Sequence, residues 1–587
     1  MLNMFRYFNK RDYLLLFLSV VFIILQVYLE LKIPEYIAEI TRLTQTEGSD
    51  ISQILNQGAW MLLCALGSLI FAVAVGYCAA TASASFQKNI RAAFYHQVES
   101  FSMTEIKKFS IPSLITRSTN DIRQVHFFLV MGIQMIVRAP ITATIAISKI
   151  YAKGWEFSLI TIIAVAVVLL TIITLIILVL PKFKIIQTLI DNINRITREN
   201  LTGIRVIRAY NAEKYQTKKF EKANTDLTNT NIFIQRAMGI FEPTVTTVMT
   251  GLTIAIYWVG AALINSANLQ DKLTIFSDTV VFSNYAVQVV ISFMVLTGVF
   301  IMYPRASVSM RRLNEVLKTK PSIVEGNINH DINPERGTVE FKNVSFKYPD
   351  AEDYVLQNIS FKSTQGQTVA FIGSTGSGKS TLINLIPRFY DVTEGEILIN
   401  GQNVKDLKKS FLMDKIGYIS QDAVLFRGTI QHNLKFGQKA GQKPTKKQLG
   451  LATKISQSEE FIQKQKQGLK AKVSQAGKNF SGGQKQRLSI ARAIARDPEI
   501  YIFDDSFSAL DYKTDAKLRH ELSKHTKHAT KFIVAQRIGT IKEADQIIVL
   551  DNGRCVGSGT HQDLIKNCKV YQEIALSQLS QTELEAI

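Results

Sequence analysis

"QTVAFIGSTGSGKSTLINLI", residues 367–386, decides the fold of the second half of this chain. The apolar run 368–372 indicates a buried strand, and an amphipathic helix begins near Ser380. Between them, "GSTGSGKS" (373–380) satisfies G-x-x-x-x-G-K-[S/T], the pattern of a phosphate-binding loop that joins a strand to a helix. We therefore predict an α/β domain that binds a nucleotide at this loop.

The residues of this loop have separate tasks. Gly373, Gly376 and Gly378 let backbone N–H groups turn inward around phosphate oxygens. Lys379 is expected to reach the β- and γ-phosphates, and the Ser380 hydroxyl to ligate Mg²⁺. The alternative is a glycine-rich turn without a ligand. The preceding strand, the following helix and an acid farther along the chain argue against that alternative.

That acid lies in "EIYIFDDSFSALD", residues 499–511. Its apolar run is typical of a central parallel strand, and Asp504 at its end can hold the Mg²⁺ shell. Asp504 or Asp505 could instead cap the following helix, although capping does not explain why Asp504 closes a buried strand. An enzyme that cleaves a nucleotide usually has a longer acid second, to reach the attacking water. Because Asp505 is short, the stretch raises the question of whether this chain cleaves its nucleotide or only holds it.

A second anion site is predicted in "NFSGGQKQRLSIARAIAR", residues 479–496. Ser481, Gly482 and Gly483 precede a strong helix, so they present backbone donors and the positive end of its dipole. Two glycines before a helix often form only a cap. One nucleotide rarely needs two helix N-termini, and the sequence alone does not explain why both are present.

The first half contains apolar stretches long enough to cross a bilayer, which takes roughly 20 residues. They lie near 13–33, 56–80, 127–152, 156–180, 240–264 and 278–302, and "LITIIAVAVVLLTIITLIILVL" in the fourth has no charge. The first is too long for a signal peptide and five more follow it, so we expect it to be retained. The lipid bilayer is therefore an expected partner.

Basic residues set the orientation of these spans. They concentrate in the two long segments, after spans two and four, whereas the remaining loops show only Arg42, Lys153 and Lys272. Basic loops stay in the cytoplasm, so both termini and both long segments are predicted to be cytoplasmic. Much of the net charge of +20 is thus a topology signal. No compact stretch interleaves basic and aromatic residues, which argues against nucleic acid as a partner.

The two long segments are predicted to form helical arms. From Ala79 to Ile111 there is no proline or glycine, and 182–238 contains a single glycine, Gly203. At about 1.5 Å per residue, each segment can form two arms that extend some 30–40 Å beyond the bilayer.

Two ionisable residues within the spans, Arg138 in "VRAP" and Glu242 in "FEP", leave two interpretations open. They line a substrate or gating pathway, or they precede a proline-initiated turn. The cysteines, Cys64, Cys78, Cys555 and Cys568, lack metal-ligand spacing and are interpreted as small buried thiols in a reducing compartment.

Turn residues cluster around 318–337, where the apolar periodicity stops. We therefore predict a transmembrane domain over 1–317, a linker over 318–337, a nucleotide-binding domain over 338–575 and a tail over 576–587. "VEFKNVSFKY" and "ISFKST" alternate like antiparallel strands and start the second domain.

Together these residues resemble an ABC transporter of the exporter type, over nearly the whole chain. "GSTGSGKS" is similar to Walker A, "YIFDD" to Walker B, "FSGGQ" to the family signature and "SALD" to the D-loop. "ENLTGIRVIRAYNAE" (199–213) and "RASVSMRRLNEVL" (305–317) are similar to exporter segments. The resemblance implies six transmembrane helices with long cytoplasmic extensions, then an α/β P-loop domain with an antiparallel β subdomain and a helical subdomain.

The resemblance also implies a set of ATP contacts. Tyr348 in "FKYPD" matches the aromatic residue that stacks on adenine, and Gln421 in "YISQD" matches a glutamine that ligates Mg²⁺. The implied residues around this chain's own ATP and Mg²⁺ are Tyr348, Gly373, Ser374, Thr375, Gly376, Ser377, Gly378, Lys379, Ser380, Thr381, Gln421 and Asp504. Ser380, Gln421 and Asp504 are those expected at the metal.

In this family two nucleotide domains close head to tail around ATP, which explains the two helix N-termini. Ser481, Gly482, Gly483 and Gln484 would then serve ATP on a partner. The arms would end in short coupling helices that transmit closure to the spans. Six spans make half a transporter, so a second subunit is implied.

Two positions depart from the hydrolytic pattern of the family. Asp505 replaces the catalytic Glu, and Gln536 in "VAQR" replaces the His of the switch region. Asp is one methylene shorter, and a general base misplaced by about 1 Å can cost roughly a hundredfold in rate. Gln cannot take a positive charge, so the γ-phosphate loses one stabiliser. "SQAGKN" (474–479) also lacks the glutamate usual before the signature.

This double departure resembles one subunit of heterodimeric bacterial multidrug exporters. We expect a weak ATP site here, a homologous partner with intact Glu and His, and lipophilic compounds as cargo. A peptide exporter or a lipid flippase of the same fold is an alternative, since apolar spans suit all three. A regulatory membrane subunit that binds ATP without transport is another, which the intact signature disfavours.

Overall fold

The chain is described from a computed structural model that covers residues 6–46, 50–151, 155–268, 271–332, 335–438 and 444–578. It divides into two compact units. The first consists of Met1–Glu99 and Ile111–Thr319, and the second of Ser100–Ser110 and Lys320–Ile587. The short segment Ser100–Ser110 therefore belongs to the C-terminal unit, although the chain on both sides of it belongs to the first.

Among its described residues, the first unit contains six helices that are long and apolar enough to cross a membrane. Each predicted span lies within one of them, except that residue 152, at the end of the third span, lies outside the described residues. The helices of this unit are α1 (Lys10–Gln45), α2 (Ile51–Glu99), α4 (Ile111–Thr116), the π-helical turn η2 (Arg117–Asp121), α5 (Ile122–Tyr151), α6 (Trp155–Thr202), α7 (Ile204–Ala209), α8 (Glu213–Ser266) and α9 (Lys272–Lys318).

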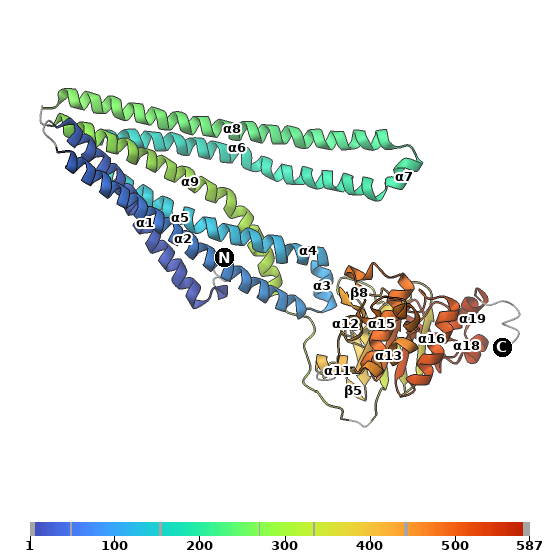
Figure 1. Cartoon of the computed structure of the whole chain (residues 1–587). Helices are drawn as coiled ribbons and strands as arrows, with labels where there is room; N and C mark the ends of the chain where they lie inside the picture. Colours follow the sequence, from blue (N-terminus) through green and yellow to red (C-terminus); the bar gives the residue numbers. More distant parts are fainter. Residues whose placement is uncertain are drawn as a thin grey trace. The chain divides into compact units, whose positions relative to one another are not determined.

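Several helices continue far beyond their apolar stretches, as the absence of helix breakers predicted. Helix α2 runs on to Glu99, and α6 and α8 form a long hairpin that the short helix α7 closes (Figure 1). A chain that leaves the membrane as helix satisfies its backbone hydrogen bonds internally, and α6 and α8 also pack against each other.

The core of this unit is formed by apolar side chains from α1, α2, α5, α6, α8 and α9. Phe157 of α6 stacks on Phe282 of α9, with ring centroids 4.3 Å apart. The buried Tyr285 of α9 donates its hydroxyl proton to the carbonyl of Leu31 in α1, at 2.9 Å. These contacts join the first, fourth and sixth spans.

The two ionisable residues singled out from the sequence have different surroundings. Nη2 of Arg138 lies 2.9 and 2.8 Å from the two carboxylate oxygens of Glu30 in α1, so its charge is paired within the unit. Glu242 is exposed. Pro140 and Pro243, which follow them, lie inside α5 and α8.

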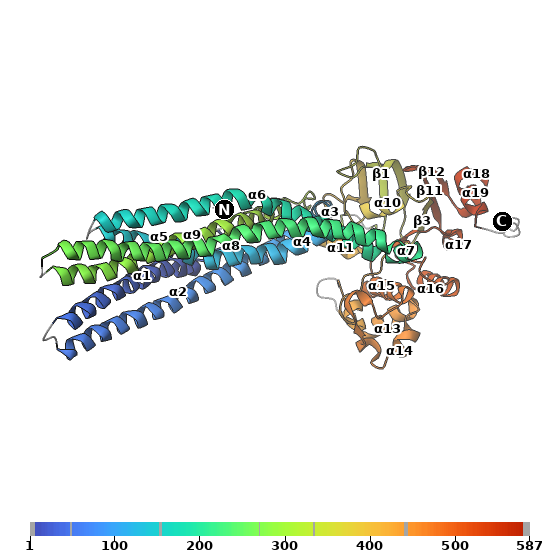
Figure 2. The ribbon, with the colours of Figure 1, turned by 90° about the horizontal axis from the view of Figure 1, so that it is seen from above.

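The second unit is built on two main sheets (Figure 2). The antiparallel sheet has the strand order β2-β1-β4-β5, and the six-stranded sheet has the order β12-β11-β3-β10-β9-β6, with a short β7-β8 ladder elsewhere. The strands are β1 (Val339–Phe346), β2 (Leu356–Ser363), β3 (Thr368–Gly373), β4 (Glu394–Ile399), β5 (Gln402–Asn403), β6 (Ile416–Ile419), β7 (Gly428–Thr429), β8 (Lys472–Val473), β9 (Ile500–Asp504), β10 (Thr530–Val534), β11 (Gln546–Asp551) and β12 (Arg554–Gly559).

The continuous apolar run of β3 follows from its central place in the larger sheet. It pairs in parallel with β10 on one side and with β11 on the other. Val369 and Phe371 enter the core shared with the antiparallel sheet, whereas Ala370 and Ile372 enter the core shared with the helical part. A parallel strand covered on both faces needs apolar residues at every position.

Helices surround these sheets. They are α3 (Met103–Phe109), α10 (Lys379–Leu385), α11 (Lys409–Lys415), α12 (Ile430–Leu434), α13 (Lys446–Ile455), α14 (Glu459–Gln463), α15 (Gly482–Arg496), α16 (Tyr512–His525), α17 (Ile538–Ile541), α18 (His561–Asn567) and α19 (Lys569–Leu576), with 3₁₀ turns η3 (Gly468–Lys470) and η4 (Gln475–Gly477). Figure 2 shows α13, α14 and α15 on one side of the unit and the β1 sheet on the other, which matches the predicted helical and antiparallel subdomains. All four cysteines are free thiols, and only Cys555 is more than slightly exposed.

Candidate nucleotide-binding site

The glycine-rich loop lies between the end of β3 and the start of α10, as its pattern predicted. Gly378 caps α10 in the left-handed conformation, with φ of 97°. A Cβ at this position would lie 2.7 Å from Cδ2 of Leu356. The close approach and the positive φ both require glycine here. Thr375, Gly376, Gly378, Lys379 and Ser380 of the loop line one pocket, where successive backbone N–H groups can bind an anion.

The loop lysine lies inside this concavity. Nζ of Lys379 donates to the carbonyls of Gly373 at 2.9 Å and Ser374 at 2.7 Å, and lies 3.3 Å from Oγ of Ser377. Burial lowers the pKa of Lys379, against the charge of Asp505. A buried ammonium held mainly by carbonyl oxygens is well placed to exchange them for a more negative phosphate.

Asp504 ends β9 directly beside the loop. The Ser380 hydroxyl donates to Oδ1 of Asp504 at 2.8 Å, and the Tyr418 hydroxyl donates to Oδ2 at 3.3 Å. Burial raises the pKa of the Asp504 carboxyl, against these two hydrogen bonds. The helix after "SFSALD" is capped by Asp511, whose carboxylate accepts from the N–H of Thr514 at 3.0 Å. The interpretation of Asp504 or Asp505 as caps of that helix is therefore wrong.

The two residues that depart from the hydrolytic pattern contact each other directly. Nε2 of Gln536 donates to Oδ2 of Asp505 at 2.9 Å. Asp505 has φ of 46°, a left-handed conformation that Asp adopts more readily than most residues. Burial, and then the charge of Asp504, raise the pKa of Asp505. The side chain that would act as the general base is thus short, buried and held by a neutral amide.

Asp505, Gln536 and part of the glycine-rich loop line one pocket of about 250 Å³. It is lined by Val355, Thr375, Gly376, Gly378, Lys379, Ser380, Thr381, Gln421, Asp505, Val534 and Gln536. The pocket unites the loop, the glutamine of "YISQD" and both unusual positions, which come from four distant parts of the sequence.

Tyr348 reaches this site through Thr381. The hydroxyl groups of Tyr348 and Thr381 lie 3.0 Å apart, so the aromatic residue adjoins the first turn of α10. Its ring is perpendicular to that of Phe346, at 5.0 Å, and to that of Tyr390, at 5.3 Å between centroids. The ring is therefore held in one orientation next to the loop.

The predicted signature residues lie elsewhere, at the start of α15. The Ser481 hydroxyl accepts from the N–H of Gln484 at 3.3 Å, and the Gln484 side chain accepts from the N–H of Ser481 at 3.0 Å. Ser481 and Gly482 are exposed. Phe480, where the family usually has Leu, is buried against Phe461. None of the signature residues lines the pocket at the glycine-rich loop.

Sequence reasoning missed Tyr418 and Lys107. Tyr418 hydrogen-bonds to Asp504, and its place three residues before Gln421 was the only available signal. Lys107 lies over the ring of Tyr348, at 4.4 Å from its centroid, and more than two hundred residues separate the two along the chain.

This fold and site define an ATP-binding P-loop domain joined to a six-helix membrane domain. The ABC transporter transmembrane region family matches residues 16–303, and the ABC transporter family matches residues 356–508. An "uncharacterized ABC transporter ATP-binding protein" of Mycobacterium tuberculosis is 38% identical, over 93% of each chain. An "ATP-dependent lipid A-core flippase" of Haemophilus influenzae is 29% identical, over 86% of this chain and 84% of that protein. A solved structure of a bacterial Atm1-family ABC exporter with ATP bound has a TM-score of 0.78 and 23% identity, and covers 97% of this chain and all of that one.

The chain therefore belongs to the ABC transporter family. It is a multi-pass membrane protein with a cytoplasmic nucleotide-binding domain, and its ATP hydrolysis is coupled to transport.

Proposed function

We propose that this chain is one subunit of a heterodimeric ATP-driven exporter of lipophilic compounds, including multiple drugs. Its own P-loop holds Mg·ATP and cleaves it slowly, while its signature helix completes the competent site of the partner. The single observation that carries this proposal is the 2.9 Å contact between Gln536 and Asp505.

That contact explains slow cleavage in physical terms. A general base must reach a water in line with the γ-phosphate, and an error of about 1 Å costs roughly a hundredfold. Asp505 lacks the methylene of Glu, and one of its oxygens already accepts from the Gln536 amide. The Gln536 amide in turn donates an N–H to the carboxylate, and because it is neutral it cannot stabilise negative charge on the γ-phosphate as a protonated His could. The two substitutions thus act on one another as well as on the nucleotide.

The residues around the loop suit Mg²⁺. Asp504 and Ser380 place a carboxylate and a hydroxyl oxygen 2.8 Å apart, and Gln421 lines the same pocket. Mg²⁺ prefers oxygen ligands, and it usually combines one or two protein ligands with phosphate oxygens and water. The metal would neutralise charge on the β- and γ-phosphates when ATP is bound. Ser380 and Asp504 would hold it, with Gln421 as a third donor.

A partner subunit accounts for the exposed signature. The start of α15 offers backbone donors and a dipole end that its own pocket does not use. In a head-to-tail dimer these groups would face the γ-phosphate held by a homologous half-transporter with intact Glu and His.

The tip of the α6–α8 hairpin also fits a partner. Helix α7 buries Ile207, whereas Val206 is 61% exposed and the adjoining Tyr210 is 81% exposed. Apolar side chains at the end of a long polar arm are costly in water unless another surface covers them. The resemblance to exporters assigns this tip the role of a coupling helix on a nucleotide domain.

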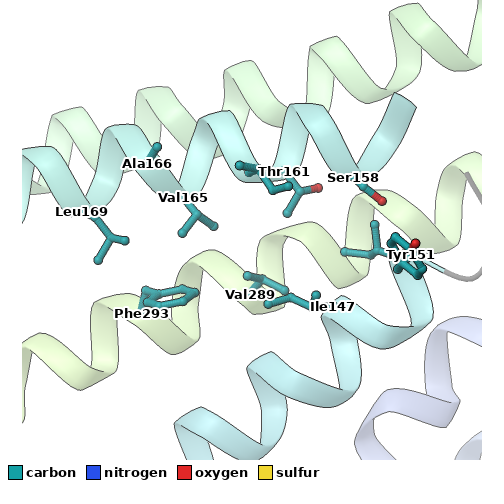
Figure 3. Close-up of a pocket in the computed structure, with 11 residues that line it drawn as sticks. Ile147, Tyr151, Ser158, Thr161, Val165, Ala166, Leu169, Val289 and Phe293 are labelled. Atoms are coloured by element: carbon teal, nitrogen blue, oxygen red, sulfur yellow. The ribbon is translucent and has the colours of Figure 1, made fainter. Parts of the chain in front are cut away.

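A cavity in the membrane domain supports lipophilic cargo. Its volume is about 290 Å³, and it lies between α5, α6 and α9, near the C-terminal end of α5 and the N-terminal end of α6 (Figure 3). Val165, Leu169, Val289 and Phe293 form much of its wall. The Thr161 hydroxyl in the wall donates to the Phe157 carbonyl at 2.9 Å, so this group is satisfied within α6. Such a wall binds hydrocarbon rather than a charged group.

Export of lipid is the second candidate, because relatives at 29% identity are named lipid A-core flippases. Peptide export and a regulatory role without transport are the remaining two functions that the same fold could serve. To separate the four, the chain and a homologous half-transporter with Glu and His would be reconstituted in vesicles. ATP-dependent movement of a fluorescent lipophilic dye supports the proposal. If only labelled lipid or only labelled peptide moved, that molecule would be assigned as the cargo instead of lipophilic drugs. ATP binding without any transport would favour a regulatory subunit.

A further inference from the structure

Helix α3 is fixed to the nucleotide-binding unit, although the chain on both sides of it belongs to the membrane unit. Ser102 and Glu105 form a capping box in its first turn. Glu105 also accepts from the N–H of Ser322 at 3.2 Å, and the hydroxyl groups of Ser102 and Ser322 lie 3.0 Å apart. These contacts hold α3 against the start of the linker, so any group on its surface keeps a defined place beside the nucleotide domain.

One such group is the ammonium of Lys107. Its Nζ lies 4.4 Å from the ring centroid of Tyr348 and 5.5 Å from that of Tyr390. A cation within about 6 Å of a ring centroid is attracted by the electrons of the ring face. The hydroxyl of the same Tyr348 lies 3.0 Å from the hydroxyl of Thr381, in the first turn of α10. The side chain of Tyr348 therefore links α3 to the first turn of α10, which directly follows the phosphate-binding loop.

The Tyr348 ring is also a suitable platform for a base. Aromatic side chains bind nucleic-acid bases by stacking, and every base offers a π face for it. The Thr381 contact places this ring beside the loop that takes the phosphates. Its perpendicular neighbours, Phe346 and Tyr390, restrict its orientation. A purine that stacks there meets the ammonium of Lys107.

We propose that Lys107 and the adenine of bound ATP compete for the ring of Tyr348, so that filling this chain's own site releases the contact between α3 and that ring. The proposal rests on the proposed function, in which this P-loop holds ATP. Lys107 is then a positioning residue that reports occupancy, and it takes no part in cleavage.

The competition has a consequence for a site that holds ATP and cleaves it slowly. Coupling between two binding events is reciprocal, so if adenine displaces Lys107, then Lys107 on the ring weakens ATP binding by the same factor. The contact stays released for as long as ATP stays bound. Occupancy alone, without hydrolysis, would then change how α3 is held.

The test is a Mg·ATP titration of the full chain in lipid nanodiscs. Lys107→Met keeps the length and apolar stem of the side chain and removes its charge. We expect this variant to bind ATP about two- to fivefold more tightly, the range of an exposed cation–π contact. Lys107→Arg should keep the wild-type affinity, because guanidinium also binds ring faces. Lys108→Met, which removes the same charge from the same helix, is the matched control and should not change the affinity.

Two further titrations separate competition from a general charge effect. Inorganic tripolyphosphate has no base, so Lys107→Met should not tighten its binding. In a Tyr348→Leu background the effect of Lys107→Met on ATP should disappear, as a double-mutant cycle requires for a contact between the two residues.

Unchanged or weaker ATP binding by Lys107→Met would overturn the competition, as would an equal gain in Lys108→Met or with tripolyphosphate. In these cases the wild-type chain still binds ATP, and the proposed function stands. A wild-type chain that fails to bind Mg·ATP would instead refute both.

Discussion

Restoring both unusual positions, Asp505→Glu together with Gln536→His, should turn the holding site into a cleaving one. The longer acid regains about 1 Å of reach toward the water, which is worth roughly a hundredfold. The imidazole can donate a hydrogen bond to the γ-phosphate and, when protonated, carries a positive charge that stabilises it. It also removes the amide that now donates to Asp505 at 2.9 Å. We therefore expect hydrolysis at this chain's own P-loop to rise about a hundredfold in the double variant.

The contact between the two residues makes the single variants informative. Asp505→Glu alone leaves the Gln536 amide in place to hold the new carboxylate, and Gln536→His alone leaves the acid short. Each single variant should recover only a small part of the rate. The product of the two single-variant rate increases should therefore be smaller than the rate increase of the double variant. Because residue 505 has a φ of 46°, the melting temperature of each variant is measured alongside its activity.

The assay uses the heterodimer with the catalytic Glu of the partner changed to Gln, so that the remaining ATPase belongs to this chain's P-loop. Dye efflux is measured in the same vesicles with an unmodified partner. Efflux should not rise in proportion to ATPase, because retained ATP biases the nucleotide domains toward contact. No rise in ATPase for a stably folded double variant would refute the reasoning from Asp505 and Gln536. An equal rise in efflux would refute the holding role.

Three further outcomes are expected. Ser481→Ala or Gly483→Asp should reduce the ATPase of the heterodimer more than Asp505→Asn does, since α15 serves the competent site; the opposite order would reverse the assignment of the two sites. Val165→Trp should fill the membrane cavity and weaken dye-stimulated ATPase, while Val167→Trp, at a 42% exposed position outside the cavity wall, should not. Burial, and then the charge of Lys542, lower the pKa of His561 from 6.5. The unfolded chain therefore binds a proton at His561 more readily than the folded chain does, and thermal stability should fall as the pH drops below 6.5. His561→Gln should lose that pH dependence, and an unchanged melting profile between pH 7 and 5.5 in both proteins would contradict this.

Much of the fold could be predicted because its signals are local. Apolar stretches of sufficient length specified the six spans, and the absence of glycine and proline specified the arms beyond them. The strand, loop and helix around Lys379 follow from one continuous pattern. The continuous apolar run of β9, which ends on Asp504, likewise predicted a strand in the interior of a parallel sheet, where β9 pairs with β10.

The contacts between distant segments could not be predicted in the same way. The family pattern identified Asp505 and Gln536 as separate losses, but nothing in their spacing indicated that one donates to the other. Lys107 had no signal at all, because its ring contact depends on α3 grouping with the second unit. The sequence also did not show that α5 and α8 continue through Pro140 and Pro243, which neighbouring helices can support inside a span.

The central claim, that this chain's P-loop holds ATP and cleaves it far more slowly than the partner's site does, can be tested by following the γ-phosphate. The working heterodimer would be allowed to turn over with photoreactive ATP that carries a label on either the α- or the γ-phosphate. After crosslinking, the label on each subunit would be counted. We predict equal α- and γ-label on this chain and mostly α-label on its partner. If this chain lost its γ-label as fast as the partner, the account would be contradicted.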